Sequence, residues 1–291
     1  MQRTLLSLVT IIAPFVAQAQ VNTDILLMDM SGKKKEIILS NPRNITNHAG
    51  YDNQPHFHKS EPVVYYSSAQ PDGKMDIRSY NLQTKQTTDF TATPENEFSP
   101  TLTPDGKYIS CIIQRDNGKQ DLGMYNLESK AVTVLIDNLT VGYHAWIDSK
   151  NLLLFILAED GHELQHYNLD TKQNKVLSKG IGRSLHKIPG QQAMSFIDKA
   201  DKDQWLIKRY DIRTGEITTI APTLAGREDI TWTQNGTILS SDGEKIYSYR
   251  PGKGKAWQEV KVKGQTDFMK GITRLAVNHS NNQLAVVVSE W

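Results

Sequence analysis

The sequence predicts an all-β fold, specifically a six-bladed β-propeller built from four-stranded antiparallel blades. Three observations predict it. A segment of about forty-odd residues recurs along the chain, which is the length of one blade. Within each copy, apolar residues alternate on both sides of polar turns, as in half-buried strands. Finally, each chain end carries one half of a blade.

An alternating hairpin with a tyrosine at the same position supplies the repeat. The five tyrosines are spaced 45, 42, 43 and 39 residues apart and are Tyr80, Tyr125, Tyr167, Tyr210 and Tyr249. The turns between the two strands consist of Gly, Asn, Asp, Thr or Lys, which tolerate tight geometry. We expect these hairpins to be the two outer strands of each blade.

A second recurring segment precedes each outer hairpin and predicts the two inner strands. Its best copy begins at Phe98 and turns at Pro104-Asp105-Gly106. Six such inner pairs are present once residues 271–277 and 283–288 are counted. The sixth pair has no outer hairpin after it, whereas residues 24–32 and 35–39 match an outer hairpin that lacks an inner pair.

The two half-blades therefore predict closure of a ring by pairing of N-terminal outer strands with C-terminal inner strands. Closure leaves no unpaired sheet edge between the first and last blades. The alternative is an open solenoid, which needs distinct capping units at both ends. Complementary half-blades favour the closed ring.

The first residues predict export. A basic start at Arg3 is followed by an apolar run over residues 5–16 and by Ala17-Gln18-Ala19. This is the pattern of a signal peptide cleaved after Ala19, and the run is shorter than the roughly 20 apolar residues that span a bilayer. We expect a signal peptide over residues 1–19, a single propeller domain over residues 20–291, and a periplasmic or secreted protein without a membrane span.

The charge balance limits the classes of expected binding partner, and the cysteine content limits the expected chemistry. Lys plus Arg is 33 and Asp plus Glu is 32, so nucleic acid is not an expected partner. The single cysteine, Cys111, lies in an apolar run and is expected to be a buried thiol rather than a nucleophile. We expect a monomer that binds an envelope protein or a small ligand at one propeller face.

The segment from Phe98-Ser99-Pro100 to Asp105-Gly106-Lys107 resembles the WD-like repeat of TolB and of the propellers of prolyl oligopeptidases. Residues 50–55 look like the opening of the same repeat, and the likeness spans essentially the whole mature chain. It implies a TolB-like propeller in the bacterial envelope without the TolB N-terminal domain. It does not carry over peptidase activity, since the chain has no Gly-x-Ser-x-Gly elbow.

Candidate ligand-binding residues follow from aligning the inner strands. Because side chains alternate between faces, one face should pack between blades while the other lines the central channel. The equivalent positions of the six inner strands are Pro55, Pro100, His144, Leu185, Ile230 and Thr273. The candidate residues at the channel mouth are His56, His58, Tyr143, His186, Asp229 and Arg274.

Three of these candidates, His56, His58 and His186, are also candidate ligands for a divalent metal. The alternative is a polar channel wall that holds water, and no contiguous ligand signature favours a metal. The catalytic residues are unassigned, and a divalent metal at these histidines is the one cofactor that the sequence suggests.

Two functions agree with this sequence. The first is a non-catalytic binding or interaction module of the bacterial envelope, because propeller loops provide a variable surface on a rigid ring. The second is a lyase or hydrolase acting on a carbohydrate or lactone, with a histidine-lined metal site in the channel. The first is preferred, and stoichiometric metal would distinguish the second.

Overall fold

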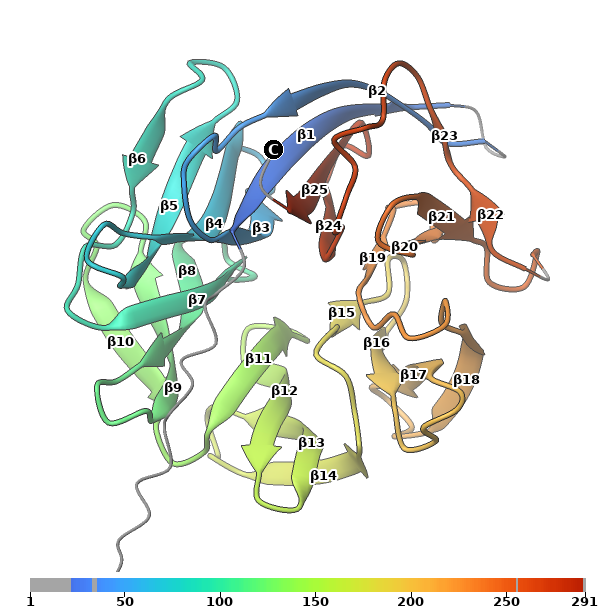
Figure 1. The fold of residues 1–291 in the computed structure, drawn as a ribbon. Helices are drawn as coiled ribbons and strands as arrows, with labels where there is room; N and C mark the ends of the chain where they lie inside the picture. The colour runs from blue at the N-terminus through green and yellow to red at the C-terminus, as the bar shows by residue number, and fades with distance from the viewer. Residues whose placement is uncertain (1–21, 33–35, 255, 290–291) are drawn as a thin grey trace, which may run out of the picture.

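Each repeat forms one sheet, and the six sheets stand around a common axis (Figure 1). The computed structural model describes residues 22–32, 36–254 and 256–289. The expected signal peptide, residues 1–19, lies outside the described residues. In the described part of the chain, no helix is long and apolar enough to cross a membrane.

Five sheets contain consecutive strands, and each is ordered from the axis outwards. The first consists of β3 (Asp52–Phe57), β4 (Val63–Ala69), β5 (Met75–Asn81) and β6 (Thr87–Asp89); the second of β7 (Asn96–Leu102), β8 (Tyr108–Gln114), β9 (Gln120–Asn126) and β10 (Val132–Ile136). The third consists of β11 (Val141–Trp146), β12 (Asn151–Ala158), β13 (Gly161–Asn168) and β14 (Asn174–Lys179); the fourth of β15 (His186–Lys187), β16 (Ala193–Asp198), β17 (Leu206–Asp211) and β18 (Ile217–Pro222). The fifth consists of β19 (Ile230–Trp232), β20 (Ile238–Ser241), β21 (Ile246–Tyr249) and β22 (Gln258–Glu259).

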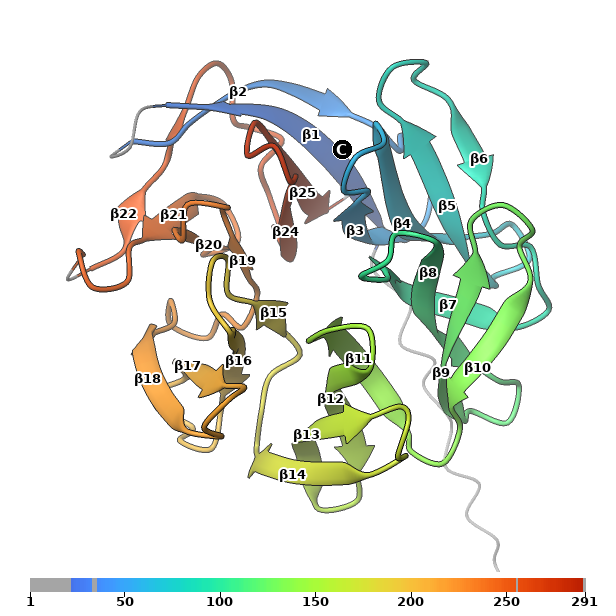
Figure 2. The same ribbon diagram turned by 180° about the vertical axis from the view of Figure 1, so that it is seen from behind.

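The sixth sheet joins the two ends of the chain, as the half-blades predicted. Its inner strands are β24 (Arg274–Val277) and β25 (Gln283–Ser289), and its outer strands are β1 (Thr23–Ser31) and β2 (Ile38–Asn44). Strands β1 and β25 are antiparallel over seven residue pairs, with Leu26 opposite Val286. The predicted closure of the ring is confirmed, and Figure 2 shows β1 between β2 and β25 from behind.

A short fifth strand of this sheet was not predicted. Strand β23 (Lys261–Val262) lies parallel to β2, with Ile38 opposite Lys261 and Leu39 opposite Val262. It belongs to the connection between blades five and six, which crosses the outside of the closing blade (Figure 1). An unpaired edge strand presents its backbone N–H and C=O groups to solvent. Pairing with β23 covers part of this edge on β2.

Among the described residues, the hydrophobic core consists of six clusters, each lying between two neighbouring blades. The cluster between blades one and two, for example, contains Ile77 from β5 together with Ile109 and Cys111 from β8. The predicted burial of Cys111 is confirmed, and burial raises the pKa of its thiol well above the usual range. Because apolar burial is the main favourable term in folding, each blade depends on both neighbours for its stability.

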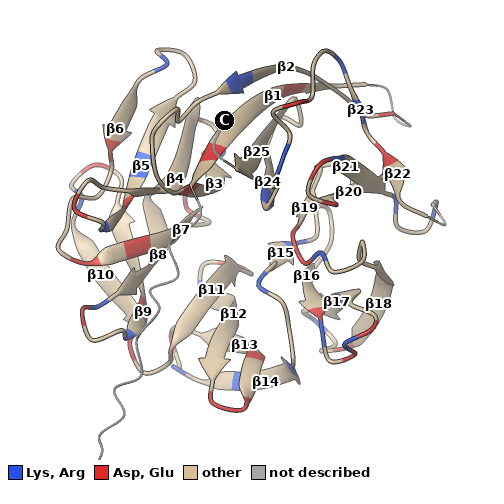
Figure 3. Ribbon diagram, viewed as in Figure 1, with Lys and Arg blue, Asp and Glu red and all other residues tan. Residues whose placement is uncertain are grey.

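A similar polar contact recurs at two places where the chain leaves the outer strand of a blade. Thr46 Oγ1 donates to Asp24 Oδ1 at 2.9 Å at the junction of blades six and one. Thr91 Oγ1 donates to Asp76 Oδ1 at 3.1 Å at the junction of blades one and two. Ionised side chains of both signs are otherwise scattered over all blades (Figure 3), in line with the balanced composition.

Candidate functional site

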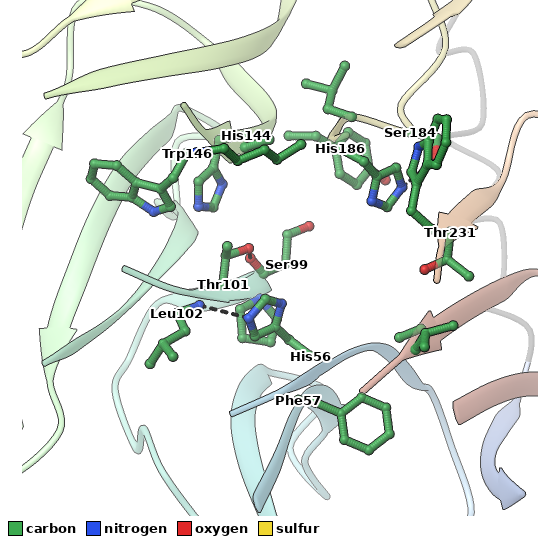
Figure 4. Close-up of a pocket in the computed structure, with 18 of the residues that line it drawn as sticks. His56, Phe57, Ser99, Thr101, Leu102, His144, Trp146, Ser184, His186 and Thr231 are labelled. Atoms are coloured by element: carbon green, nitrogen blue, oxygen red, sulfur yellow. Dashed lines mark hydrogen bonds between the residues drawn. The ribbon is translucent and has the colours of Figure 1, made fainter. Parts of the chain in front are cut away.

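A cavity of about 920 Å³ occupies the central channel and is lined by side chains from all six blades. Figure 4 shows part of its wall, with His56, Ser99, His144 and His186 around a common space. The inner strands supply this wall because they are the strands nearest to the axis. The cavity is within the range of about 300–1,000 Å³ that is typical of small-ligand sites.

Bulges at the start of the inner strands set which side chains reach the channel. The pairing shifts between Asn53 and His56 in blade one and between Phe98 and Thr101 in blade two. At these bulges Gln54 and Ser99 have φ values of 59° and 57°, a left-handed conformation that is uncommon for residues other than glycine. Such local strain persists where the surrounding structure holds it, and both residues line the cavity.

The structure corrects the alignment of blade six while preserving its faces. The inner hairpin of blade five closes at Thr233, and that of blade six closes at Asn278. Counting back from these residues aligns Arg274 with Asp229, whereas the sequence alignment paired Arg274 with Thr231. The error is two positions, which leaves Arg274 on the same face because strand side chains alternate with a period of two.

Five of the six predicted binding residues line this one cavity: His56, Tyr143, His186, Asp229 and Arg274. His58 is not among the lining residues. Its Nδ1 accepts hydrogen bonds from the backbone N–H groups of Ser60 and Glu61, at 3.2 and 2.8 Å. The structure therefore places His58 in the turn after the inner strand of blade one, beyond the end of β3.

His56 forms a hydrogen bond that connects blades one and two, and His186 is linked to blade five through Ser184. His56 Nε2 accepts from the backbone N–H of Leu102 at 3.1 Å. His186 Nε2 lies 3.0 Å from Ser184 Oγ, which accepts from the backbone N–H of Ile230 at 3.2 Å. An imidazole nitrogen that accepts a backbone hydrogen bond is unprotonated. His56 is therefore a neutral link in the wall.

A third histidine, His144, connects blades two and three. Its Nε2 lies 2.7 Å from Ser110 Oγ, which also accepts from Trp146 Nε1 at 2.9 Å and donates to the carbonyl of Thr101 at 2.9 Å. Because a hydroxyl has one proton to donate, this network assigns the proton of the His144–Ser110 bond to His144. His144 Nδ1 is buried and has no hydrogen-bond partner among the described residues.

Burial keeps all three histidines uncharged near neutral pH. It lowers the pKa of His56 to about 4, with further contributions from His58 and His186. It lowers the pKa of His144 to about 3 and that of His186 to about 4. Desolvation disfavours the charged imidazolium, so the middle of the channel is polar but carries no histidine charge.

Charged side chains gather at the end of the channel where the inner strands begin. We call this end the channel mouth and define it by Tyr143 together with the charged residues Arg183, Asp229 and Arg274. Arg183 Nη2 donates to Asp229 Oδ2 at 2.5 Å. Although burial acts in the opposite direction, the charge of Asp229 and this hydrogen bond raise the pKa of Arg183 above its usual range. Arg274 Nη2 donates to Tyr143 Oη at 3.1 Å, and Arg274 Nη1 lies 3.9 Å from Asp229 Oδ1.

Sequence reasoning missed Arg183 and treated His144 only as an alignment anchor. Arg183 lies in the loop before β15 and outside the aligned strand positions, so no periodic signal identified it. The candidate metal ligands His56 and His186 do line the same cavity. Among the residues that the structure describes, no group of three or more His, Cys, Asp or Glu side chains is placed to hold a metal ion.

No model of a protein family matches the sequence, and no curated protein matches it either. Solved structures do share the fold. A putative TolB from Agrobacterium tumefaciens has a TM-score of 0.69 and 11% identity, over 93% of this chain and 99% of that one. TolB from Acinetobacter baumannii has a TM-score of 0.58 and 12% identity, over 91% of this chain and 63% of that one.

The fold is therefore that of the TolB-like six-bladed propellers. The chain spans less than two thirds of the Acinetobacter baumannii TolB. An oligogalacturonate lyase in complex with manganese has a TM-score of 0.53 and 12% identity, over 94% of this chain and 98% of that one. Since a TolB and a lyase share this fold, function has to be argued from the residues of the channel.

Proposed function

We propose that the chain is an exported, non-catalytic binding module of the bacterial envelope, which presents the channel mouth to an envelope protein or a small ligand. One observation carries the proposal. Side chains from all six blades converge on one cavity, in which the three histidines already form hydrogen bonds within or between blades. The wall is thereby rigid, while the charged residues at the mouth face a space large enough for a ligand.

Export is part of the proposal and is supported by the basic start, apolar run and Ala17-Gln18-Ala19 of the leader. The intact mass of the protein recovered from the envelope fraction tests it directly. We expect the mass of a chain that begins at Gln20. A chain retaining Met1 in the cytosolic fraction would contradict export.

Site-specific photocrosslinking tests the binding face. Asn138 is exposed in the loop that enters β11 at the mouth, whereas Lys172 is exposed in the turn between β13 and β14. Because successive strands are antiparallel, these two positions lie at opposite ends of blade three. A crosslinker at Asn138 should capture a ligand or partner, and one at Lys172 should not. Equal capture from both positions would contradict a binding face at the mouth.

Metal analysis separates the module from the alternative enzyme, which would act on a carbohydrate or lactone. A binding module should contain no stoichiometric metal after purification. Stoichiometric metal that is lost on His56→Ala and His186→Ala, but kept on His162→Ala, would favour the enzyme. His162 is exposed in β13 and is not among the residues that line the cavity, so it provides a matched substitution.

A further inference from the structure

The guanidinium of Arg274 is largely buried but makes few contacts with the protein. Its side chain is 16% exposed, and the one hydrogen bond it donates within the described residues goes to Tyr143 Oη. A guanidinium has five N–H donors in a planar fork. Most of the donors of Arg274 are therefore directed to the channel rather than to protein acceptors.

The nearby carboxylates are already neutralised by other side chains. Asp229 accepts the short hydrogen bond of Arg183, and its 3.9 Å separation from Arg274 exceeds hydrogen-bond length. Glu228 Oε2 accepts from Lys199 Nζ at 3.2 Å. Three cations thus face two carboxylates, and Arg274 shares its carboxylate, Asp229, with the more tightly bound Arg183.

The middle of the channel wall offers hydrogen bonds but no histidine charge. The other charged residues of the lining lie at or beyond the ends of the inner strands, away from the mouth, and are Lys59, Asp105, Asp148 and Lys187. The three histidines are neutral near pH 7 because burial lowers their pKa values. The hydroxyl of Ser99 lines the same cavity and, within the described residues, is buried without a hydrogen-bond partner. Electrostatic attraction is stronger in such a partly desolvated space than in water.

We propose that the channel mouth binds a carboxylate group, which accepts hydrogen bonds from the fork of Arg274 while Tyr143 positions that fork. Tyr143 is suited to the second role, because its ring lies 5.2 Å from the guanidinium carbon of Arg274 and its hydroxyl accepts from Nη2. A carboxylate matches the two parallel N–H groups of one arginine and balances one positive charge. This inference rests on the proposed binding function.

The carboxylate could belong to a small organic acid or to the C-terminus of a peptide, and calorimetric titration separates these sources. The probes are D-glucuronate with D-glucose as its neutral counterpart, and acetyl-trialanine with a free or an amidated C-terminus. We expect the charged member of at least one pair to bind and its neutral counterpart not to bind.

Variants assign the binding to Arg274. Arg274→Gln should weaken binding of the acid about tenfold or more, because a charge-assisted hydrogen bond contributes about 1.5–3 kcal/mol. Arg274→Lys keeps the charge without the planar fork, so its affinity for the acid should lie between those of the natural protein and Arg274→Gln. Arg213→Gln makes the same change at an exposed arginine in the turn between β17 and β18, and should leave the affinity unchanged.

The outcomes distinguish failure of the carboxylate inference from failure of the proposed binding function on which it rests. If neither acid binds, or if Arg274→Gln folds and binds the acid as tightly as the natural protein, the carboxylate inference is overturned. Capture by the crosslinker at Asn138 would then still support the binding module. Conversely, loss of that capture together with metal bound through His56 and His186 would overturn the binding module itself.

Discussion

The middle of the channel and its mouth use polar side chains in opposite ways. In the middle, His56, His144 and His186 are neutral and already hydrogen-bonded, and two of these bonds lead directly to a neighbouring blade. At the mouth, Arg274 is charged and donates one hydrogen bond within the described part of the chain. Both regions look like polar channel wall in sequence, yet the middle is held by neutral histidines whereas the mouth keeps a charged arginine with N–H donors left for a ligand.

The difference shows why residue type alone is a poor guide to a binding site. Histidine suggested metal chemistry, but its two ring nitrogens also suit links between blades in a desolvated wall. Arginine cannot lose its charge, so an arginine without a full set of acceptors keeps its attraction for anions. We therefore expect substitutions in the middle to change stability and substitutions at the mouth to change binding.

The largest expected effect is on folding, from His144→Ala. His144 is 7% exposed, and its removal takes packing from the channel wall and one partner from Ser110. We expect the free energy of unfolding to fall by about 3 kcal/mol, measured by urea denaturation. The control His279→Ala, in an exposed turn, should change it by less than about 0.5 kcal/mol. Equal effects of the two substitutions would refute a structural role for His144.

The second test uses pH. The pKa of His56 is about 4 in the folded protein, against an ordinary value of 6.5, so the unfolded chain binds the proton more readily. Stability from this group is complete above pH 6.5 and is lost as the pH falls towards 4. His56→Gln keeps an acceptor for Leu102 but cannot take up a proton. Between pH 7 and pH 5 the natural protein should lose about 2 kcal/mol relative to this variant. Parallel stability curves would contradict the neutral link.

A third, smaller effect is expected on ligand binding from Tyr143→Phe. The substitution removes the hydroxyl that accepts from Arg274 Nη2 but retains the ring beside the guanidinium. We expect carboxylate affinity to fall roughly fivefold, as one net hydrogen bond of about 1 kcal/mol predicts. The affinity is measured by the same titration, and the neutral probes should remain inactive. An unchanged affinity would show that Tyr143 does not position the fork.

The smallest effect is that of Arg274→Gln on stability. The ion pair with Asp229 is loose and one hydrogen bond is lost, so we expect a change of under about 1 kcal/mol in the free energy of unfolding. Urea denaturation of Arg274→Gln and of His144→Ala under the same conditions compares their free energies of unfolding. If Arg274→Gln destabilised the fold as strongly as His144→Ala, the mouth and the middle would not differ in kind.

Much of the architecture was predictable because it depends on residue patterns that are short in sequence and repeat along the chain. The tyrosine spacing and the complementary half-blades predicted six sheets and the pairing of β1 with β25. Strand β23 was not predictable in this way. It pairs through only two residues and depends on where a long connection crosses the closing blade.

The candidate site was predicted in part. Period-two alternation brought five of six candidates to one cavity, because each blade repeats the same strand geometry. The period-two alternation was followed past the end of β3, which put His58 on the channel face. The side chain of His58 instead accepts a hydrogen bond in the turn after β3. Arg183 lay in a loop, where no periodic rule applies.

By itself, the sequence determined the repeat, the strand faces and the closure of the ring, because hydrophobic alternation and turn chemistry are local properties of the chain. The tertiary structure alone decided which polar groups have partners. Ser110 meets His144 and Trp146 only when blades two and three pack, and Arg274 meets Tyr143 across 131 positions of sequence. Hydrogen-bond satisfaction and desolvation depend on such distant neighbours, so the charge of the channel mouth and the neutrality of its histidines emerge only in the folded ring.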